Sequence, residues 1–187
     1  MARILLKTPP MPATRMRSGE GGFTLVELMI VTVILGILAA IAIIIFRKYV
    51  QKSKTAEAYT MLGDIRAKQE AYKAEFSQYC NVSATLDDGN RHPATAPMAD
   101  GTKTAWDPVP AGWQQLGVRP DGPVWFGYVT TGGIPGQAIG GADPPAVNVN
   151  DHWWAARAIV DLNGNGTFGY YETVNGARGI AIINEGE

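Results

Sequence analysis

The chain has 187 residues, a formal net charge of −1 and a hydrophobic share of 46%. This length allows one small globular domain beside a helical stem. The nearly balanced charge gives no basic field over the chain, and no block of like charges is long enough to form a binding tail, so no specific nucleic-acid partner is predicted. The single cysteine, Cys80, excludes an intrachain disulfide. We expect it to be a half-buried residue at a helix end, with an intermolecular disulfide as the alternative.

The first 22 residues differ in composition from the rest of the chain. They hold four basic side chains, one acidic side chain and three prolines, and they end in a polar, glycine-rich stretch. An ordinary export signal places its apolar core before the cleavage site, whereas here the apolar run comes afterwards. Residues 1–22 are therefore predicted to be a leader peptide that is cleaved off, and its positive charge predicts a cytoplasmic amino terminus.

An uncharged run extends from Leu28 to Phe46. At about 1.5 Å per residue it is about 28 Å long, close to the hydrocarbon thickness of a bilayer. Residues 23–46 are therefore predicted to form a transmembrane helix. Glu27 lies at its start, where a carboxylate is unfavourable, because even the lower estimates for an acidic side chain at mid-membrane are about 2.5 to 3.5 kcal/mol. Glu27 is therefore a candidate functional residue.

The helical pattern continues beyond this run. Apolar and amide side chains recur there in steps of three and four, which is the spacing of one helix face. These are Ala56, Tyr59, Leu62, Ile65, Gln69, Tyr72, Phe76 and Tyr79. No proline interrupts the chain between residues 13 and 92. Residues 47–79 are therefore predicted to be an amphipathic continuation of the same helix, which would run from about Phe23 to Gln78.

Residues 80–187 are predicted to form a globular, β-rich head. Polar, Gly-rich and Pro-rich composition predicts loops over residues 81–111 and 134–150, while residues 113–118 return the chain to the core. Strands are predicted at residues 124–131, 153–160, 168–174 and 178–183, because aromatic and β-branched residues are concentrated there. The short connections favour a small antiparallel meander packed on the helix, so the predicted fold class is α+β.

A possible calcium loop lies between the second and third predicted strands. Asp161, Asn163 and Asn165, followed by Gly166 and by Glu172, satisfy the spacing of an oxygen-ligand loop. The four side-chain oxygen groups would bind Ca²⁺. The alternative is a plain hairpin turn, because Asn-Gly pairs favour such turns and two strands, rather than two helices, flank the segment.

The sequence contains no other motif typical of a catalytic or metal-binding site. His92 and His152 lie in separate predicted loops without a zinc-like spacing of neighbours, and we expect both to be solvated. No glycine-rich phosphate cradle follows a strand, and no Gly-x-Ser-x-Gly nucleophile turn is present. The chain is therefore not expected to be an enzyme.

The segment from Gly22 to Ile43 resembles the prepilin signature of type IV pilins and of the related type II secretion pseudopilins. The match comprises Gly22-Phe23-Thr-Leu-Val-Glu27-Leu, followed after an apolar stretch by Gly-Ile-Leu-Ala-Ala-Ile-Ala. The resemblance implies the pilin fold, in which a long helix packs on a small sheet. It also implies that a prepilin peptidase cleaves between Gly22 and Phe23 and methylates the new amine. Glu27 would then take part in assembly by pairing with the terminal ammonium of a neighbouring subunit.

One position departs from the family's pattern. Related proteins usually have a proline where this chain has Ile44. Proline kinks a helix, so its absence predicts a straighter apolar segment in which Gly36 is the weakest point.

The resemblance implies that the chain is a structural subunit of a type IV pilus. Such a subunit would wait in the bacterial inner membrane as a single-pass protein and then polymerise through its helix into a surface filament. Its partners would be copies of itself, other pilins, the prepilin peptidase, the pilus assembly platform and the inner membrane. A minor pilin, or a type II secretion pseudopilin in a periplasmic filament, is an alternative. A different class of function would be a membrane-anchored domain that never polymerises and binds a ligand or Ca²⁺.

Overall fold

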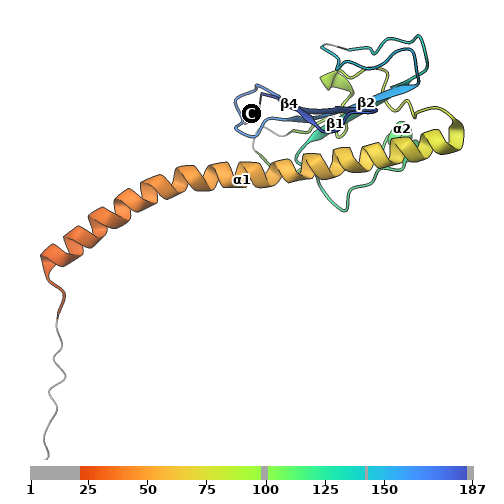
Figure 1. Cartoon of the computed structure of the whole chain (residues 1–187). Helices are drawn as coiled ribbons and strands as arrows, with labels where there is room; N and C mark the ends of the chain where they lie inside the picture. Colours follow the sequence, from red (N-terminus) through yellow and green to blue (C-terminus); the bar gives the residue numbers. More distant parts are fainter. Residues whose placement is uncertain (1–21, 98–100, 142, 185–187) are drawn as a thin grey trace, which may run out of the picture. The chain divides into compact units, whose positions relative to one another are not determined.

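A computed structural model describes residues 22–97, 101–141 and 143–184 of the chain (Figure 1). The predicted leader, residues 1–22, lies outside the described residues except for Gly22. The chain divides into two compact units, residues 1–44 and 45–187, and each is described by itself. The first unit contributes the beginning of helix α1, and the second contains the rest of α1 and the head.

Helix α1 spans Leu25–Phe76, which confirms the predicted long helix and ends it two residues before the expected Gln78. Thr24 is positioned as the N-cap residue, and its Oγ1 accepts a hydrogen bond from the Glu27 backbone N–H at 3.2 Å. At the other end, Ser77 has a positive φ of 58°, a conformation in which a helix cannot continue.

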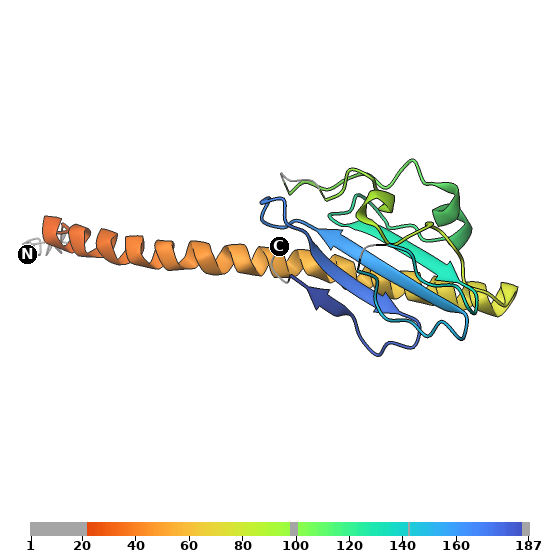
Figure 2. The ribbon, with the colours of Figure 1, turned by 90° about the horizontal axis from the view of Figure 1, so that it is seen from above.

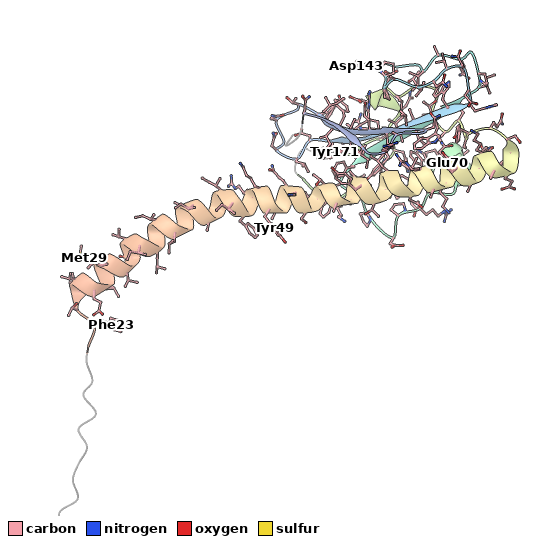
Figure 3. All side chains as sticks on the ribbon, in the orientation of Figure 1. Phe23, Met29, Tyr49, Glu70, Asp143 and Tyr171 are labelled. Atoms are coloured by element: carbon pink, nitrogen blue, oxygen red, sulfur yellow. The ribbon has the colours of Figure 1, made fainter. Side chains whose placement is uncertain are left out.

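The part of α1 in the first unit is apolar on all sides. Large apolar side chains such as Leu25, Met29 and Ile37 are each more than half exposed, and Figure 3 shows side chains projecting from both sides of the helix there. Among the described residues, α1 is the one helix long and apolar enough to cross a membrane, and no residue of its most apolar stretch is buried. A helix of this kind buries its side chains in lipid or against other helices.

The head contains one antiparallel sheet in which consecutive strands are neighbours, in the order β1-β2-β3-β4 (Figures 1 and 2). The strands are β1 Gly127–Gly133, β2 Trp153–Val160, β3 Gly169–Val174 and β4 Ala181–Ile183. This confirms the predicted meander and the α+β fold class. The first strand begins three residues later than expected, because Val124 instead pairs with Thr104 in an isolated bridge.

Two short helices interrupt the segments that connect α1 to the sheet. They are η1 Asp88–Asn90 and α2 Ala111–Leu116. The predicted return of the chain to the core at residues 113–118 is confirmed, since Trp113, Leu116 and Val118 are all buried. Residues 81–111 were predicted to be a loop, and within them the structure has the single helical turn η1.

The sheet is covered on both faces. The face toward α1 carries Trp154, Ala156 and Ala158 of β2, which pack in one cluster with Leu62 and Ile65 of α1. The opposite face carries Ala155 and Ile159 of β2 and Val129 of β1, and these pack with Leu86 and with residues of the 134–150 segment. The core therefore has two layers, and the small side chains in the middle of β2 leave room for the large ones of α1.

The buried face of α1 overlaps only partly with the predicted stripe. Leu62, Ile65 and Gln69 are buried as expected, whereas Tyr59 and Phe76 are about half exposed. Ala58 and Met61, which the stripe omitted, are buried instead, because the sheet contacts a face of the helix rotated toward these residues. Phe76 lies in the last turn of the helix and packs against Tyr72 rather than against the sheet.

Gln69 fixes the chain where it leaves α1. Its side chain is fully buried, its Nε2 donates to the Cys80 carbonyl at 2.9 Å, and its Oε1 accepts the Cys80 N–H at 2.9 Å. Cys80 is buried rather than half-buried, and burial raises the pKa of its thiol to about 11. A thiol that is both buried and protonated is unsuited to a disulfide with another chain.

Replacing Gln69 with leucine keeps a side chain of similar size and removes its two hydrogen bonds with Cys80 and the one to the Thr130 hydroxyl. The Cys80 N–H and C=O then remain buried without partners, so we expect the free energy of unfolding to fall by about 2 to 4 kcal/mol. Urea titration of the detergent-extracted chain, followed by tryptophan fluorescence, measures the change. Gln78→Leu is the matched control, because Gln78 is exposed and should tolerate the same substitution. Equal stability of the two variants would contradict this role for Gln69.

Candidate functional site

The first candidate site is the beginning of α1, where Gly22, Phe23 and Glu27 lie. Gly22 is exposed, and a Cβ built on it would meet no atom within 4 Å. Its φ is also not in the left-handed region that favours glycine. Nothing in the described part of the chain therefore requires a glycine at this position.

Glu27 lies in the first turn of α1 and is exposed. Its backbone N–H is bonded to Thr24, but its carboxylate forms no hydrogen bond or ion pair with another described residue. A carboxylate in the first turn gains roughly 0.3 to 1 kcal/mol from the helix dipole. That gain is smaller than the roughly 2.5 to 3.5 kcal/mol of placing an acid inside a membrane. Helix capping alone would therefore not offset the cost of holding Glu27 inside a membrane.

The second candidate site is the connection between β2 and β3. Asp161 is buried, and its two carboxylate oxygens accept the backbone N–H groups of Gly164, Asn165 and Gly166 at 2.7 to 3.2 Å. The side chains of Asn163 and Asn165 each accept a backbone N–H two residues further along the chain. The segment is therefore a hydrogen-bonded turn between two antiparallel strands, as the hairpin alternative predicted.

The structure does not bring Glu172 to this turn. Glu172 lies opposite Arg157 in the pairing of β2 with β3, whereas Asp161 follows the end of β2, four residues beyond Arg157. At about 3.3 Å per residue, these four residues separate the backbone positions of Asp161 and Glu172 by about 13 Å along the strand direction. Calcium ligands lie only about 2.3 to 2.6 Å from the ion, so Asp161 and Glu172 do not fit one calcium site in this arrangement.

Glu172 instead forms a buried ion pair with Arg157, and both side chains are about 95% buried. The guanidinium of Arg157 also donates to the Leu86 carbonyl at 3.2 Å and to the Asp143 carbonyl at 2.8 Å. Figure 3 places Asp143 on the side of the sheet away from α1. Arg157 thus ties the covering segments to the outer face of the sheet. The sequence did not predict this ion pair, because Arg157 and Glu172 meet only through the register of β2 with β3.

Polar side chains of α1 attach the head on the inner face. The Glu57 carboxylate accepts the Trp125 backbone N–H at 2.8 Å and the Tyr128 hydroxyl at 3.2 Å. Near the other end, Glu70 accepts the Trp154 Nε1–H at 3.0 Å. Figure 3 shows Glu70 on the part of α1 that lies along the sheet. In the sequence these two acids are indistinguishable from the solvent-facing residues of an amphipathic helix, so neither was predicted to have a role.

His92 was wrongly predicted to be a solvated loop residue. It is buried, its Nε2 lies 2.7 Å from the Trp106 carbonyl oxygen, and its ring meets the Trp106 ring edge to face. Burial lowers the pKa of its imidazole. The backbone of His92 also pairs with Tyr128, which covers part of the outer edge of β1. His92 is therefore a core residue. His152, by contrast, is partly exposed beside β2, and within the described ranges it has no metal-binding group of neighbours.

Comparison with known proteins gives matches concentrated in the amino-terminal part of the chain. The family described as the prokaryotic N-terminal methylation motif matches residues 17–43. The chain is 38% identical over 109 residues to the type IV major pilin protein PilA of Myxococcus xanthus, a match that covers 54% of this chain and 50% of that protein. It is 47% identical over 51 residues to the type IV major fimbrial protein FimA of Dichelobacter nodosus, covering 27% of this chain and 33% of FimA.

A further relative is the fimbrial protein EcpC of Eikenella corrodens, 43% identical over 56 residues, which cover 30% of this chain and 37% of EcpC. The chain spans half the length or less of these curated relatives. No solved structure matches. The relatives are named as pilins or fimbrial proteins and not as enzymes, in agreement with the expectation from the sequence motifs.

The hydrogen bonds of the 161–166 turn lead to a prediction about calcium. Asp161→Ala removes the acceptor for three backbone N–H groups, so we expect it to lower the free energy of unfolding by about 1 to 3 kcal/mol. The loss should be the same in millimolar calcium and in chelator, because it arises from the turn itself. Thermal unfolding of the detergent-extracted chain under both conditions measures it. Calcium-dependent stabilisation of the wild type that Asp161→Ala abolishes would instead establish a metal site.

Proposed function

We propose that this chain is a type IV pilin, that is, a processed and polymerising subunit of a pilus filament, and its N-terminal methylation motif, its fold and its similarity to named pilins support this. Before assembly it is a single-pass protein of the bacterial inner membrane with its amino terminus in the cytoplasm. After assembly it belongs to a surface filament. Its partners are copies of itself, other pilins, the prepilin peptidase and the assembly platform. The observation that carries the proposal is the exposed Glu27, whose carboxylate has no partner among the described residues, beside an exposed Gly22.

Processing is supported by the freedom of Gly22. A Cβ would fit at this position in the described chain, so the fold leaves the choice of residue open, and we assign the glycine to an external partner that admits only a very small residue. A tight subsite of the prepilin peptidase is such a partner. Cleavage after Gly22 leaves Phe23 as the first residue, one residue before the N-cap Thr24. The new amine therefore lies close to the first turn of α1, where Glu27 is.

Polymerisation is supported by the side chains of the first unit. An all-round apolar helix serves equally well in lipid or packed against several other helices, so the same segment anchors the precursor and forms the filament core. The two environments differ for Glu27. In lipid its carboxylate has no partner, whereas beside the ammonium of Phe23 in another subunit it forms an ion pair. Such a pair offsets the desolvation of both charges only if its geometry is good.

A membrane-anchored domain that never polymerises is the rival from another class. Such an anchor has no use for a carboxylate at this depth, and the candidate ligand loop in its head is a self-bonded turn. A minor pilin and a type II secretion pseudopilin share the same helix and remain alternatives within the class. The curated relatives are named as major pilins and fimbrial proteins, which favours a pilus over a secretion filament.

Processing predicts a defined mature protein. Cleavage after Gly22 leaves 187 − 22 = 165 residues beginning at Phe23, with one methyl group on the terminal amine. Intact-mass spectrometry of the membrane-extracted protein measures this. Gly22→Val should leave the precursor uncut, whereas Gly36→Val, a matched change at another glycine with open space around it, should be processed normally. A mature protein that begins at any other residue would disprove the assignment.

Assembly predicts a specific defect for Glu27 variants. Glu27→Val removes an unfavourable charge from the membrane, so the protein should accumulate and be cleaved, yet fail to enter filaments when it is the only copy. Glu27→Gln keeps the shape but lacks the charge, and it should be intermediate or equally defective. Immunoblots of sheared and membrane fractions score both variants. Normal filaments from Glu27→Val would favour the monomeric anchor.

A further inference from the structure

Two clefts flank α1 in the head. One, here called the basic cleft, has a volume of about 250 Å³ and lies between α1 and the β3–β4 turn, with Arg66 and Arg178 in its lining. The other, here called the acidic cleft, has a volume of about 720 Å³ and lies between α1 and residues 119–125, with Asp64 and Asp121 in its lining. Both clefts belong to the second unit.

The charges of the basic cleft are not balanced within the described ranges of the chain. Arg66 donates to the Thr173 hydroxyl, but neither Arg66 nor Arg178 forms an ion pair with a carboxylate there. No acidic side chain of the described residues lines this cleft. Arg178 is exposed on the β3–β4 turn, so its guanidinium is accessible to another molecule.

The acidic cleft has the opposite sign. Its lining holds the carboxylates of Glu57, Asp64 and Asp121 and the cations of Lys103 and Arg119, a balance of 2 − 3 = −1. Glu57 is already engaged by Lys103 at 3.6 Å and by the Trp125 N–H. Asp64 and Asp121 form no hydrogen bond or ion pair with other described residues, so they are the carboxylates of this lining that are available to a partner, beside the exposed Arg119.

The two clefts face away from each other. The α1 residues that line the acidic cleft are centred roughly 150° around the helix from those that line the basic cleft, at 3.6 residues per turn. The strand order also places the two clefts at opposite edges of the sheet. Residues 119–125 precede β1 at one edge, and the β3–β4 turn belongs to the other edge (Figure 2). Asp64 and Arg66 are two residues apart on α1, so the clefts lie at nearly the same level along the helix axis.

This arrangement suits a contact between copies of the chain. Two subunits with parallel α1 helices, placed side by side in the same orientation, bring the basic cleft of one to the acidic cleft of the next. Such a contact is head to tail, and it leaves one cleft free on each outer side, so it can continue without closing. Arginine is suited to it because its planar fork matches a carboxylate with two hydrogen bonds.

We propose that the basic cleft of one subunit binds Asp64 and Asp121 of a neighbouring subunit and that this contact selects lateral neighbours in the filament. The proposal rests on the proposed function, since it needs parallel helices in an assembled filament. It assigns to the heads a role separate from the apolar segment: the helix cores supply the packing, and the two clefts determine which flanks meet.

Charge reversal tests the contact in the full chain. Arg178→Asp and Asp121→Arg, both at exposed positions, should each reduce sheared filaments about tenfold or more, because each places like charges opposite each other. The two substitutions combined restore an opposite-charge pair and should recover filaments. Asp151→Arg, an exposed change on the loop before β2, is the matched control and should assemble normally. Immunoblots of the membrane fraction verify that each variant accumulates.

The outcomes are distinguishable. Recovery in the double variant supports the contact between copies. Normal filaments from both single variants, or a double variant as defective as the singles, would overturn it. A defect in Arg178→Asp with normal assembly of Asp121→Arg would also overturn it and assign the basic cleft to a different anionic partner. Absence of filaments from the wild-type chain would instead refute the proposed function, which the Glu27 variants test separately.

Discussion

The head depends on close packing of α1 against the centre of one sheet. Leu62 and Ile65 of the helix reach the sheet because Ala156 and Ala158 of β2 leave space between them. Each fully buried Leu or Ile side chain contributes roughly 1.5 to 3 kcal/mol, so this contact supplies much of the stability of a small domain. The strands alone present two apolar faces. Without the helix on one face and the loops on the other, the sheet would have no water-excluded core.

The sequence predicted the helix and the meander because both follow from local patterns. An uncharged run indicates a membrane-length helix by its length, and the strand positions follow from clusters of aromatic and β-branched residues between Gly-rich and Pro-rich segments. The rotation of the helix could not be predicted from the stripe. Tyr59 and Phe76 matched the spacing, but Ala58 and Met61 lie on the face that the sheet covers, and only the packed partner determines that choice.

Polar residues were the least predictable part of the structure, because their roles come from partners far along the chain. Arg157 and Glu172 meet only through the register of β2 with β3, and His92 is buried by Trp106, a residue in a segment without regular pattern. Strand pairing also explains why Asp161 and Glu172, which fit one ligand pattern in the sequence, lie apart in the structure. Its spacing fits a calcium loop in a helix–loop–helix unit, whereas in a hairpin the last position moves along a strand away from the turn. By contrast, Glu27 is a candidate from the sequence alone, because an acid beside an apolar run is anomalous without any knowledge of its partner, and its role in assembly stays a prediction.

The order of the sheet also bears on how the head folds. Every strand pairs with the next one along the chain, so each hairpin closes a loop between neighbouring elements. Pairing between consecutive strands costs less chain entropy than pairing between strands further apart in the sequence, because the loop that must close is shorter. The contacts of the strands with α1 span a longer stretch of sequence, and α1 is the first described element of the chain and forms its hydrogen bonds without the sheet. The helix can therefore serve as a preformed surface on which the hairpins assemble in sequence, which shortens the time during which their apolar faces are open to aggregation.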